Sequence, residues 1–236
     1  MALFPNTLAL QRDRVRLLIQ EPTAQHWTNA TLNLYINEAQ ACIATGVLPG
    51  VTQANQGPIL ASESTTPSVD DQQFYSMPDN MHAIRVIRAR SVSTEDYVEL
   101  TPTDIAFVRA HPRTKVARPD SYFLWGESGT YQLGVYPAFN SANGLLYVSF
   151  WRLPTNMASD STVLQIPVEL LLANTYLAAY RAKLERGHLG DADMLFKTFL
   201  SEYQGALAYI NQRQINKEHA RMMGTIGDDD SEMVLY

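Results

Sequence analysis

The pattern of apolar residues divides the chain into helical ends and a β-rich middle. Residues 6–20 and 28–45 repeat apolar side chains at three- and four-residue steps, which is the spacing of an amphipathic helix. The same spacing returns over residues 167–186 and 191–214, after a long stretch that lacks it. We therefore predict helical segments near both ends of the chain.

The middle of the chain is typical of β-strands joined by loops. Residues 83–90 alternate in part, with Ile84 and Val86 on one side and Arg85, Ile87 and Ala89 on the other. Further strands are predicted at residues 97–100, 121–125, 130–136 and 145–151. Because the last three follow one another through short loops, we expect an antiparallel meander that ends in a hairpin. A short helix is expected to begin at Thr101-Pro102.

This order of elements predicts an α+β fold. Residues 1–48 and 160–214 are expected to pack into one discontinuous helical bundle, and residues 73–155 to form an antiparallel β region inserted in it. Residues 49–72, rich in Gln, Ser, Thr and Pro, are predicted to be a long loop. Residues 215–236, where the apolar period fades, are predicted to be an extended C-terminal tail.

Charge argues against a main role in binding nucleic acid, because the formal net charge is −6. Four acids, Asp228, Asp229, Asp230 and Glu232, lie in the last twelve residues, which carry no base. Without those four, the 24 acidic residues become 20, against 18 basic ones, so the body is nearly neutral. The single cysteine, Cys42, excludes an internal disulfide and fits a reducing compartment. Neither a signal peptide nor a transmembrane helix is expected.

Residues that support catalysis or bind metals are scattered. The five histidines include no pair at the i, i+4 spacing of a zinc motif, so we predict no metal site and no cofactor. Gly126-Glu127-Ser128-Gly129 resembles a nucleophile elbow, but it lies between two predicted strands and is interpreted as a hairpin turn. The acidic pairs Asp70-Asp71 and Glu95-Asp96 lie in polar stretches, whereas a general acid needs a shielded pocket. We therefore predict no catalytic residue.

Two features are candidates for binding a partner. Arg85, Arg88 and Arg90, together with Arg109, Arg113, Lys115 and Arg118, make the middle of the chain locally basic. They either discourage aggregation at a strand edge or face an acidic partner or passing DNA, although no aromatic stacking platform is interleaved with them.

The second candidate is the end of the chain, where Asp228-Asp229-Asp230 is followed closely by Met233, Val234, Leu235 and Tyr236. This segment is either a disordered terminus or a segment that adds to a neighbour's sheet edge or groove.

Four stretches occur in a characteristic order between residue 27 and about residue 210. They are WTNATLNLYINEAQACIA, FYSMPDNMHAIRVIRA, YQLGVYPAFNSANGLLYVSFWRLPT and DSTVLQIPVELLLANTYLAAYRAKLERG. In order and spacing they resemble the tail-adaptor (head-to-tail connector) proteins of short-tailed double-stranded DNA phages.

This resemblance implies a structural virion protein without enzymatic activity. The implied assembly is a ring of twelve copies beneath the portal protein, which encircles the DNA exit channel and holds the tail nozzle and tail fibre proteins. The chain would then lie in the tail or neck of the virion, assembled in the host cytoplasm, and DNA would pass it during ejection. The nearly neutral body fits a channel through which DNA slides.

Two other functions fit parts of the sequence. A tail-associated receptor- or glycan-binding β module requires exposed aromatic side chains, for which Trp125, Tyr131 and Trp151 are the candidates. A cell-wall hydrolase carried in the tail requires two carboxylates in a cleft, which the sequence does not place together. The adaptor hypothesis instead expects Tyr147, Phe150 and Trp151 to be packing residues.

Overall fold

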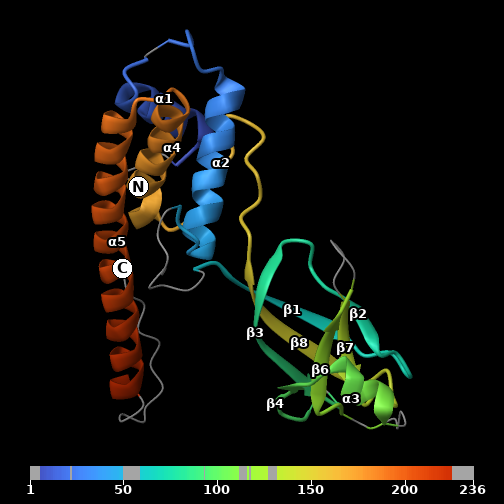
Figure 1. Ribbon diagram of the computed structural model, residues 1–236. Helices are drawn as coiled ribbons and strands as arrows, with labels where there is room; N and C mark the ends of the chain where they lie inside the picture. The colour runs from blue at the N-terminus through green and yellow to red at the C-terminus, as the bar shows by residue number, and fades with distance from the viewer. Residues whose placement is uncertain are drawn as a thin grey trace. The chain divides into compact units, whose positions relative to one another are not determined.

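The computed structural model describes residues 6–21, 23–49, 59–92, 94–111, 116, 118–126 and 132–224, with side chains up to residue 213. Helices from the two ends of the chain pack together, and two β-sheets are formed by the residues between them (Figure 1). This confirms the predicted α+β fold class. The chain divides into two compact units, Met1–Gln40 with Asn156–Tyr236, and Ala41–Thr155.

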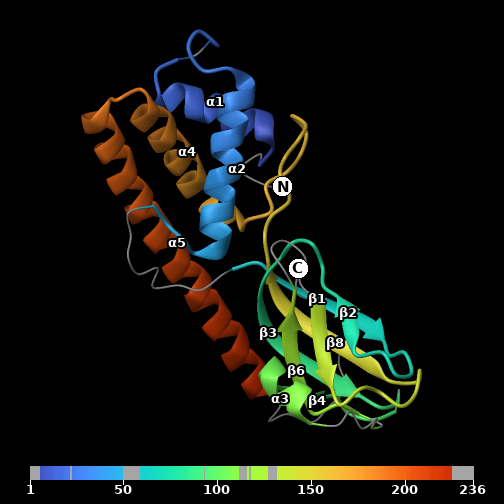
Figure 2. The same ribbon diagram turned by 45° about the vertical axis from the view of Figure 1, so that its right-hand side comes forward.

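The first unit is a helical bundle. It contains α1 (Leu8–Leu18), most of α2 (Asn29–Thr45), the short 3₁₀ helix η1 (Val168–Leu170), α4 (Leu171–Glu185) and α5 (Leu189–Gly224). In both ribbon views α4 lies beside α1 and α5 (Figures 1 and 2). The predicted apolar faces are buried, with Leu32 and Ile36 on α2, Leu177 on α4 and Phe199 on α5. Helical periodicity therefore identified these core residues correctly, although Leu10 and Leu184, which fit the same spacing, are exposed.

The helix ends agree with the sequence in part. Thr28 caps α2, because its Oγ1 accepts a hydrogen bond from the Thr31 N–H at 3.1 Å. Gly187, with φ of 75°, follows α4 as expected of a C-terminal glycine. The helix predicted from residue 191 begins two residues earlier, at Leu189, so Asp191 lies within the first turn of α5. The helix also continues to Gly224, past the predicted end at residue 214, because residues with high helix propensity extend a helix without an apolar period.

A buried carboxylate organises the turn between α1 and α2. Glu21 Oε1 accepts hydrogen bonds from the backbone N–H groups of residues 25–27, at 2.9, 2.7 and 3.0 Å. The buried Arg16 guanidinium approaches the same oxygen at 3.5 Å and donates to Asn29 Oδ1 and to the Trp27 carbonyl at 2.8 and 3.0 Å. Arg16 and Glu21 therefore form a satisfied polar centre inside the bundle.

The stability of the bundle is expected to fall in acid, partly through Glu21. Burial raises the pKa of Glu21, but the three N–H donors and Arg16 outweigh burial and hold the pKa below its ordinary value of 4.5. The stabilisation is thus fully present above pH 4.5 and is lost as the pH falls through the lower pKa of the folded state. Urea midpoints measured from pH 6 to pH 3 should fall less steeply for Glu21→Gln than for the unsubstituted chain. Equal slopes would contradict this role.

Polar side chains of α1 and α2 bind the segment through which the chain returns to the bundle. Arg12 forms a two-pronged ion pair with Asp160, at 2.8 and 3.0 Å. Asn37 accepts a hydrogen bond from the Met157 N–H at 2.8 Å, and Gln40 accepts one from the Gln165 N–H at 2.7 Å. We call these contacts the return clamp. They explain why polar residues interrupt the inner faces of two amphipathic helices.

The second unit contains two sheets, each of which mixes distant parts of the sequence. One sheet has the order β1-β8-β3-β4, formed by Ala61–Pro67, Leu145–Arg152, Met81–Arg90 and Val98–Glu99. The other has the order β2-β7-β6-β5, formed by Phe74–Ser76, Gln132–Tyr136, Ser121–Trp125 and Thr101–Pro102. The named strands pair antiparallel, as predicted, except that β5 and β6 are parallel.

The two sheets pack face to face as a sandwich. Their shared core contains Ile87, Ala89, Leu146, Val148 and Phe150 from the first sheet, and Tyr75, Leu133 and Val135 from the second. Phe150 is thus a packing residue, as expected. Tyr147 and Trp151, which alternate with it along β8, lie on the opposite face of their sheet.

The predicted meander is correct only for β6 and β7. Strand β7 lies between β2 and β6, whereas β8 lies between β1 and β3, so residues 132–136 and 145–151 do not form a hairpin. The chain between them crosses from one sheet to the other after the cis peptide bond Tyr136–Pro137. This crossing inserts the fully buried Phe139 into the shared core.

Two further boundaries differ from the prediction. The expected loop at residues 49–72 contains strand β1, and residues 50–58 lie outside the described residues. Strand β1 consists mainly of Ser, Thr and Glu because it is an edge strand with alternately exposed side chains, so it lacks an apolar signal. The short helix α3 (Ile105–Ala110) begins after the cap Asp104, whose carboxylate accepts from the Ala106 N–H at 2.9 Å. Thr101-Pro102 is strand β5 instead of the helix start.

Gly134→Ala is expected to destabilise the sandwich by about 1–3 kcal/mol, because small-to-large changes overpack a filled site. Gly134 pairs with Phe123 across β7 and β6, and a Cβ atom at residue 134 would overlap the Phe123 ring. The control is Gly205→Ala on α5, where an added Cβ meets no atom within 4 Å. This control is expected to stabilise the chain by about 0.5–1 kcal/mol. Urea denaturation measures the change in the free energy of unfolding for both variants. Equal changes would contradict the predicted overlap with the Phe123 ring.

Candidate interaction surfaces

Two arginines of β3, Arg85 and Arg90, lie against aromatic rings on the outer face of the β1-β8-β3-β4 sheet. The guanidinium carbon of Arg85 is 4.6 Å from the centre of the Trp151 ring, and that of Arg90 is 4.7 Å from the Tyr97 ring. Tyr97 in turn contacts Tyr147, with ring centres 5.6 Å apart. We define the arginine–aromatic face as the residues Arg85, Arg88, Arg90, Tyr97, Tyr147 and Trp151.

Strand register explains how these side chains gather. Arg88 of β3 is paired with Tyr147 of β8, and both project away from the shared core. Arg85 is an extra residue on β3, since Ile84 pairs with Phe150 and Val86 with Ser149. This β-bulge leaves Arg85 exposed.

Because of the β-bulge, the predicted assignment of side chains to the two faces of β3 is wrong at Arg85. Arg85 was assigned to the same side as Ile87 and Ala89, but those two residues are buried in the core while Arg85 is exposed. The expectation that no aromatic residues interleave with the arginines is also wrong, because aromatic rings lie beside them in the folded structure. Tyr147 and Trp151 come from β8 and Tyr97 from the segment before β4, so the linear sequence gives no sign of their proximity.

The arginine–aromatic face combines three arginines with neighbouring carboxylates. A hydrogen bond to Glu63 of β1 raises the pKa of Tyr147, and burial and the charge of Glu63 act in the same direction. The Tyr147 hydroxyl therefore stays neutral and donates to that carboxylate. Two carboxylates lie beside the three arginines, Glu63 next to Tyr147 and Glu99 paired with Arg88. Guanidinium groups stacked on rings keep their in-plane N–H donors for carboxylate or phosphate oxygens.

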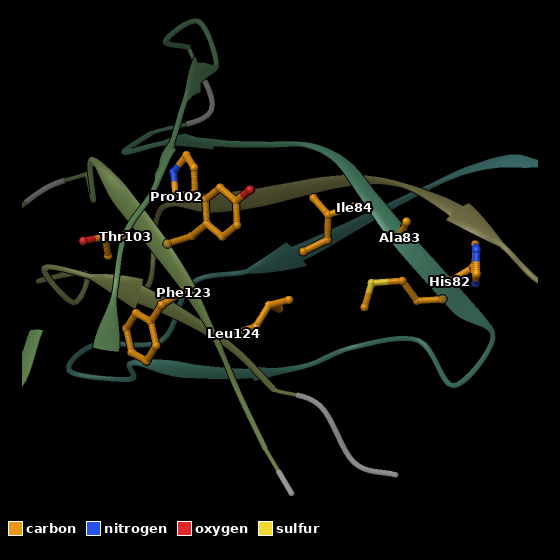
Figure 3. A pocket seen from close by; sticks show the side chains of 9 residues that line it. His82, Ala83, Ile84, Pro102, Thr103, Phe123 and Leu124 are labelled. Carbon is orange, nitrogen blue, oxygen red and sulfur yellow. The ribbon is translucent and has the colours of Figure 1, made fainter. Parts of the chain in front are cut away.

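A second surface is an apolar groove of about 630 Å³ between β3 and the β5–β6 side of the other sheet. Figure 3 shows Ile84 on one side of this groove and Pro102 and Leu124 on the other. Its remaining lining residues are Met81, His82, Ala83, Thr103, Tyr122 and Phe123. Burial, and then the charge of Glu99, raise the pKa of Tyr122. The groove combines residues of both sheets, so only the folded topology reveals it.

A smaller cavity of about 220 Å³ lies beside α3 and includes Phe74, Arg109 and Trp125 in its lining. Trp125 is 41% exposed, and the Arg109 guanidinium carbon lies 4.9 Å from its ring centre. The exposed indole that the glycan-binding hypothesis expects is therefore present at Trp125. Trp151 is partly exposed, and Tyr131 lies outside the described residues.

The remaining candidate residues fall into two groups. Asp70, Asp71, Glu95 and Asp96 are exposed, as predicted, and so lie in no shielded pocket. The following candidates lie outside the described residues: Arg113, Lys115, Glu127, Ser128, Gly129, Asp228, Asp229, Asp230, Met233, Val234, Leu235 and Tyr236.

Neither a metal centre nor a membrane-spanning helix is found among the described residues. No group of three or more His, Cys, Asp or Glu side chains there is arranged to hold a metal ion. Among the same residues, no helix combines the length and apolar character needed to cross a membrane.

A helical bundle with an inserted β-sandwich presents an arginine–aromatic face, and Arg and aromatic residues are the types enriched at macromolecular interfaces. Residues 6–225 match the family model described as SU10 adaptor protein. The chain therefore belongs to the SU10 adaptor protein family, and is a phage tail adaptor protein. This membership confirms the resemblance found in the sequence and indicates a structural role instead of an enzymatic one. No curated protein matches the chain significantly.

Proposed function

We propose that this protein is the subunit of a ring that joins the portal protein to the tail nozzle and tail fibres. Twelve copies would encircle the DNA exit channel in the neck of the virion. The observation that carries this proposal is the family match, which runs from residue 6 to residue 225 and so includes both compact units.

The physical properties of the chain support this role. A subunit of a closed ring needs two different surfaces, because each copy contacts its neighbours through heterologous interfaces. The arginine–aromatic face and the apolar groove are two chemically different surfaces of one sandwich. The nearly neutral body avoids the strong phosphate contacts that would hold DNA in place.

A receptor- or glycan-binding role is the second candidate, and the exposed Trp125 favours it. Sugars stack on open aromatic faces, but Arg109 lies over the Trp125 ring and Arg85 lies over the Trp151 ring. These contacts favour an anionic partner over a neutral sugar. A glycan array that shows binding lost in Trp125→Ala would support the second candidate.

Electron microscopy of the purified protein mixed with its portal protein tests the ring. The expected result is a ring on one face of the portal, and a mass measurement of the complex should give twelve copies. The protein alone is the control, because it separates self-assembly from assembly templated by the portal. Absence of any ring from the mixture would overturn the proposed function.

A further inference from the structure

We propose that the arginine–aromatic face binds the acidic C-terminal segment of a second copy of this chain, residues 228–236. The inference rests on the proposed ring, in which copies of the chain are neighbours. It assigns a partner to a surface of one copy and a role to a segment of the next.

Charge is the first argument. The face presents Arg85, Arg88 and Arg90, with two carboxylates beside them: Glu63, near Tyr147, and Glu99, which is paired with Arg88. The segment contains four acids within five residues and no base. Arginine forms two parallel hydrogen bonds with a carboxylate, and stacking on a ring leaves those donors available. The two partners are therefore complementary in charge and in hydrogen-bonding groups.

Spacing is the second argument. Arg88 and Arg90 lie two residues apart on the same side of β3. In an extended peptide, alternate residues also share one side, which places Asp228, Asp230 and Glu232 in a row with the same repeat. A segment extended along β3 would thus present its acidic side chains at the same two-residue spacing as Arg88 and Arg90.

The apolar residues of the segment are the third argument. Met233, Val234, Leu235 and Tyr236 follow the acids directly. Trp151 and Tyr147 offer partly exposed ring surface next to the arginines. Apolar contact with these rings would add to the ion pairs and distinguish this segment from a simple polyanion. DNA fits the face less well, because its phosphate backbone has no apolar side chains to contact these rings.

A peptide-binding experiment tests recognition. The probe is a fluorescein-labelled peptide of residues 225–236, and the acceptor is the full chain in which the four tail acids are replaced by serine, so that its own tail does not compete. Fluorescence anisotropy should show saturable binding that weakens as salt is raised. Adding Arg85→Ala and Arg88→Ala to the acceptor should weaken binding at least tenfold, whereas Arg109→Ala, outside the face, should leave it unchanged.

Two peptide variants test the register and the charge. Replacing Asp228 and Asp230 by serine should weaken binding more than replacing Asp229 and Ser231 by alanine. A peptide with Asp230→Lys should bind an Arg88→Glu acceptor better than the unchanged peptide does. Absence of binding, or binding that is insensitive to Arg85 and Arg88, would overturn the proposal. So would a short DNA duplex that binds the face more tightly than the peptide.

A mixing experiment tests whether the segment comes from a second copy. The Arg85→Glu/Arg88→Glu chain keeps its tail, and the serine-tail chain keeps its face, so neither should self-associate in the analytical ultracentrifuge. Their mixture should form a hetero-complex at concentrations above the peptide Kd. If the mixture stays monomeric although the peptide binds, the proposal is overturned.

The ring experiment separates this inference from the proposed function. If portal-bound rings form equally well with the Arg85→Glu/Arg88→Glu chain and the peptide does not bind, the inference fails while the ring stands. If the unsubstituted chain forms no ring, the proposed function fails whatever the peptide does.

Discussion

Phe139→Ala is expected to lower the free energy of unfolding of the β-sandwich by about 3–5 kcal/mol, which is the usual cost of removing a buried aromatic ring. Phe139 is fully buried in the core that the two sheets share. Its backbone is fixed, because its carbonyl accepts from the Asp71 N–H at 3.0 Å. The backbone at Gly144 packs closely against the Phe139 ring, since a Cβ atom added at residue 144 would lie 2.8 Å from Phe139 Cε1. The surroundings therefore cannot collapse into the cavity.

Urea denaturation followed by tryptophan fluorescence measures this loss, because Trp125 and Trp151 both lie on strands of the sandwich. Phe107→Ala is the matched control, since this ring is 47% exposed on α3 and its removal should cost less than about 1 kcal/mol. Similar losses for the two variants would contradict the position of Phe139 in the core.

Glu21→Ala is expected to destabilise the helical bundle by about 3–5 kcal/mol, the cost of removing one partner of a buried ion pair. The substitution takes the acceptor from three backbone N–H groups at residues 25–27. It also leaves the buried Arg16 without its carboxylate, although Arg16 keeps its bonds to Trp27 and Asn29. Both effects lower the stability of the turn that joins α1 to α2.

Helical circular dichroism during urea denaturation at pH 7 measures the effect. Glu21→Gln keeps an oxygen acceptor without the charge and should cost about 1–3 kcal/mol, the range for an imperfectly satisfied buried group. Glu38→Ala, an exposed position on α2, should change stability by about 0.5 kcal/mol or less. If Glu21→Ala were as mild as Glu38→Ala, the carboxylate would not organise the turn.

Periodic burial made the bundle predictable from the sequence. Leu32, Ile36, Leu177 and Phe199 repeat at helical spacing because each faces a neighbouring helix. The polar residues of the inner faces were not predictable, since Arg12, Asn37 and Gln40 bind residues 157–165, more than a hundred positions away in the sequence. Asn37 and Gln40 nevertheless belong to the stretch INEAQ, on which the family resemblance partly depended.

The sandwich was less predictable, because strand pairing is not local. Strand β1 carries no apolar signal at the edge of its sheet, and β8 pairs with β1 and β3 instead of with β7, which precedes it in the chain. The arginine–aromatic face escaped prediction for the same reason. Arg85 and Trp151 are 66 positions apart in the chain and meet only because β3 and β8 are neighbours with a bulge at Arg85.

The return clamp has a consequence for the order in which the parts of the chain fold during synthesis on the ribosome. Asn37 and Gln40 leave the ribosome long before the residues they bind, and α4 and α5 follow later still. At about 5–20 residues per second, the 130 residues between Gln40 and Leu171 take on the order of ten seconds to translate. The contiguous sandwich, Ala41–Thr155, is complete within that interval. We therefore expect the sandwich of a nascent chain to fold first. The apolar faces of α1 and α2 stay exposed until α4 and α5 are synthesised, and a host chaperone could bind them during that interval.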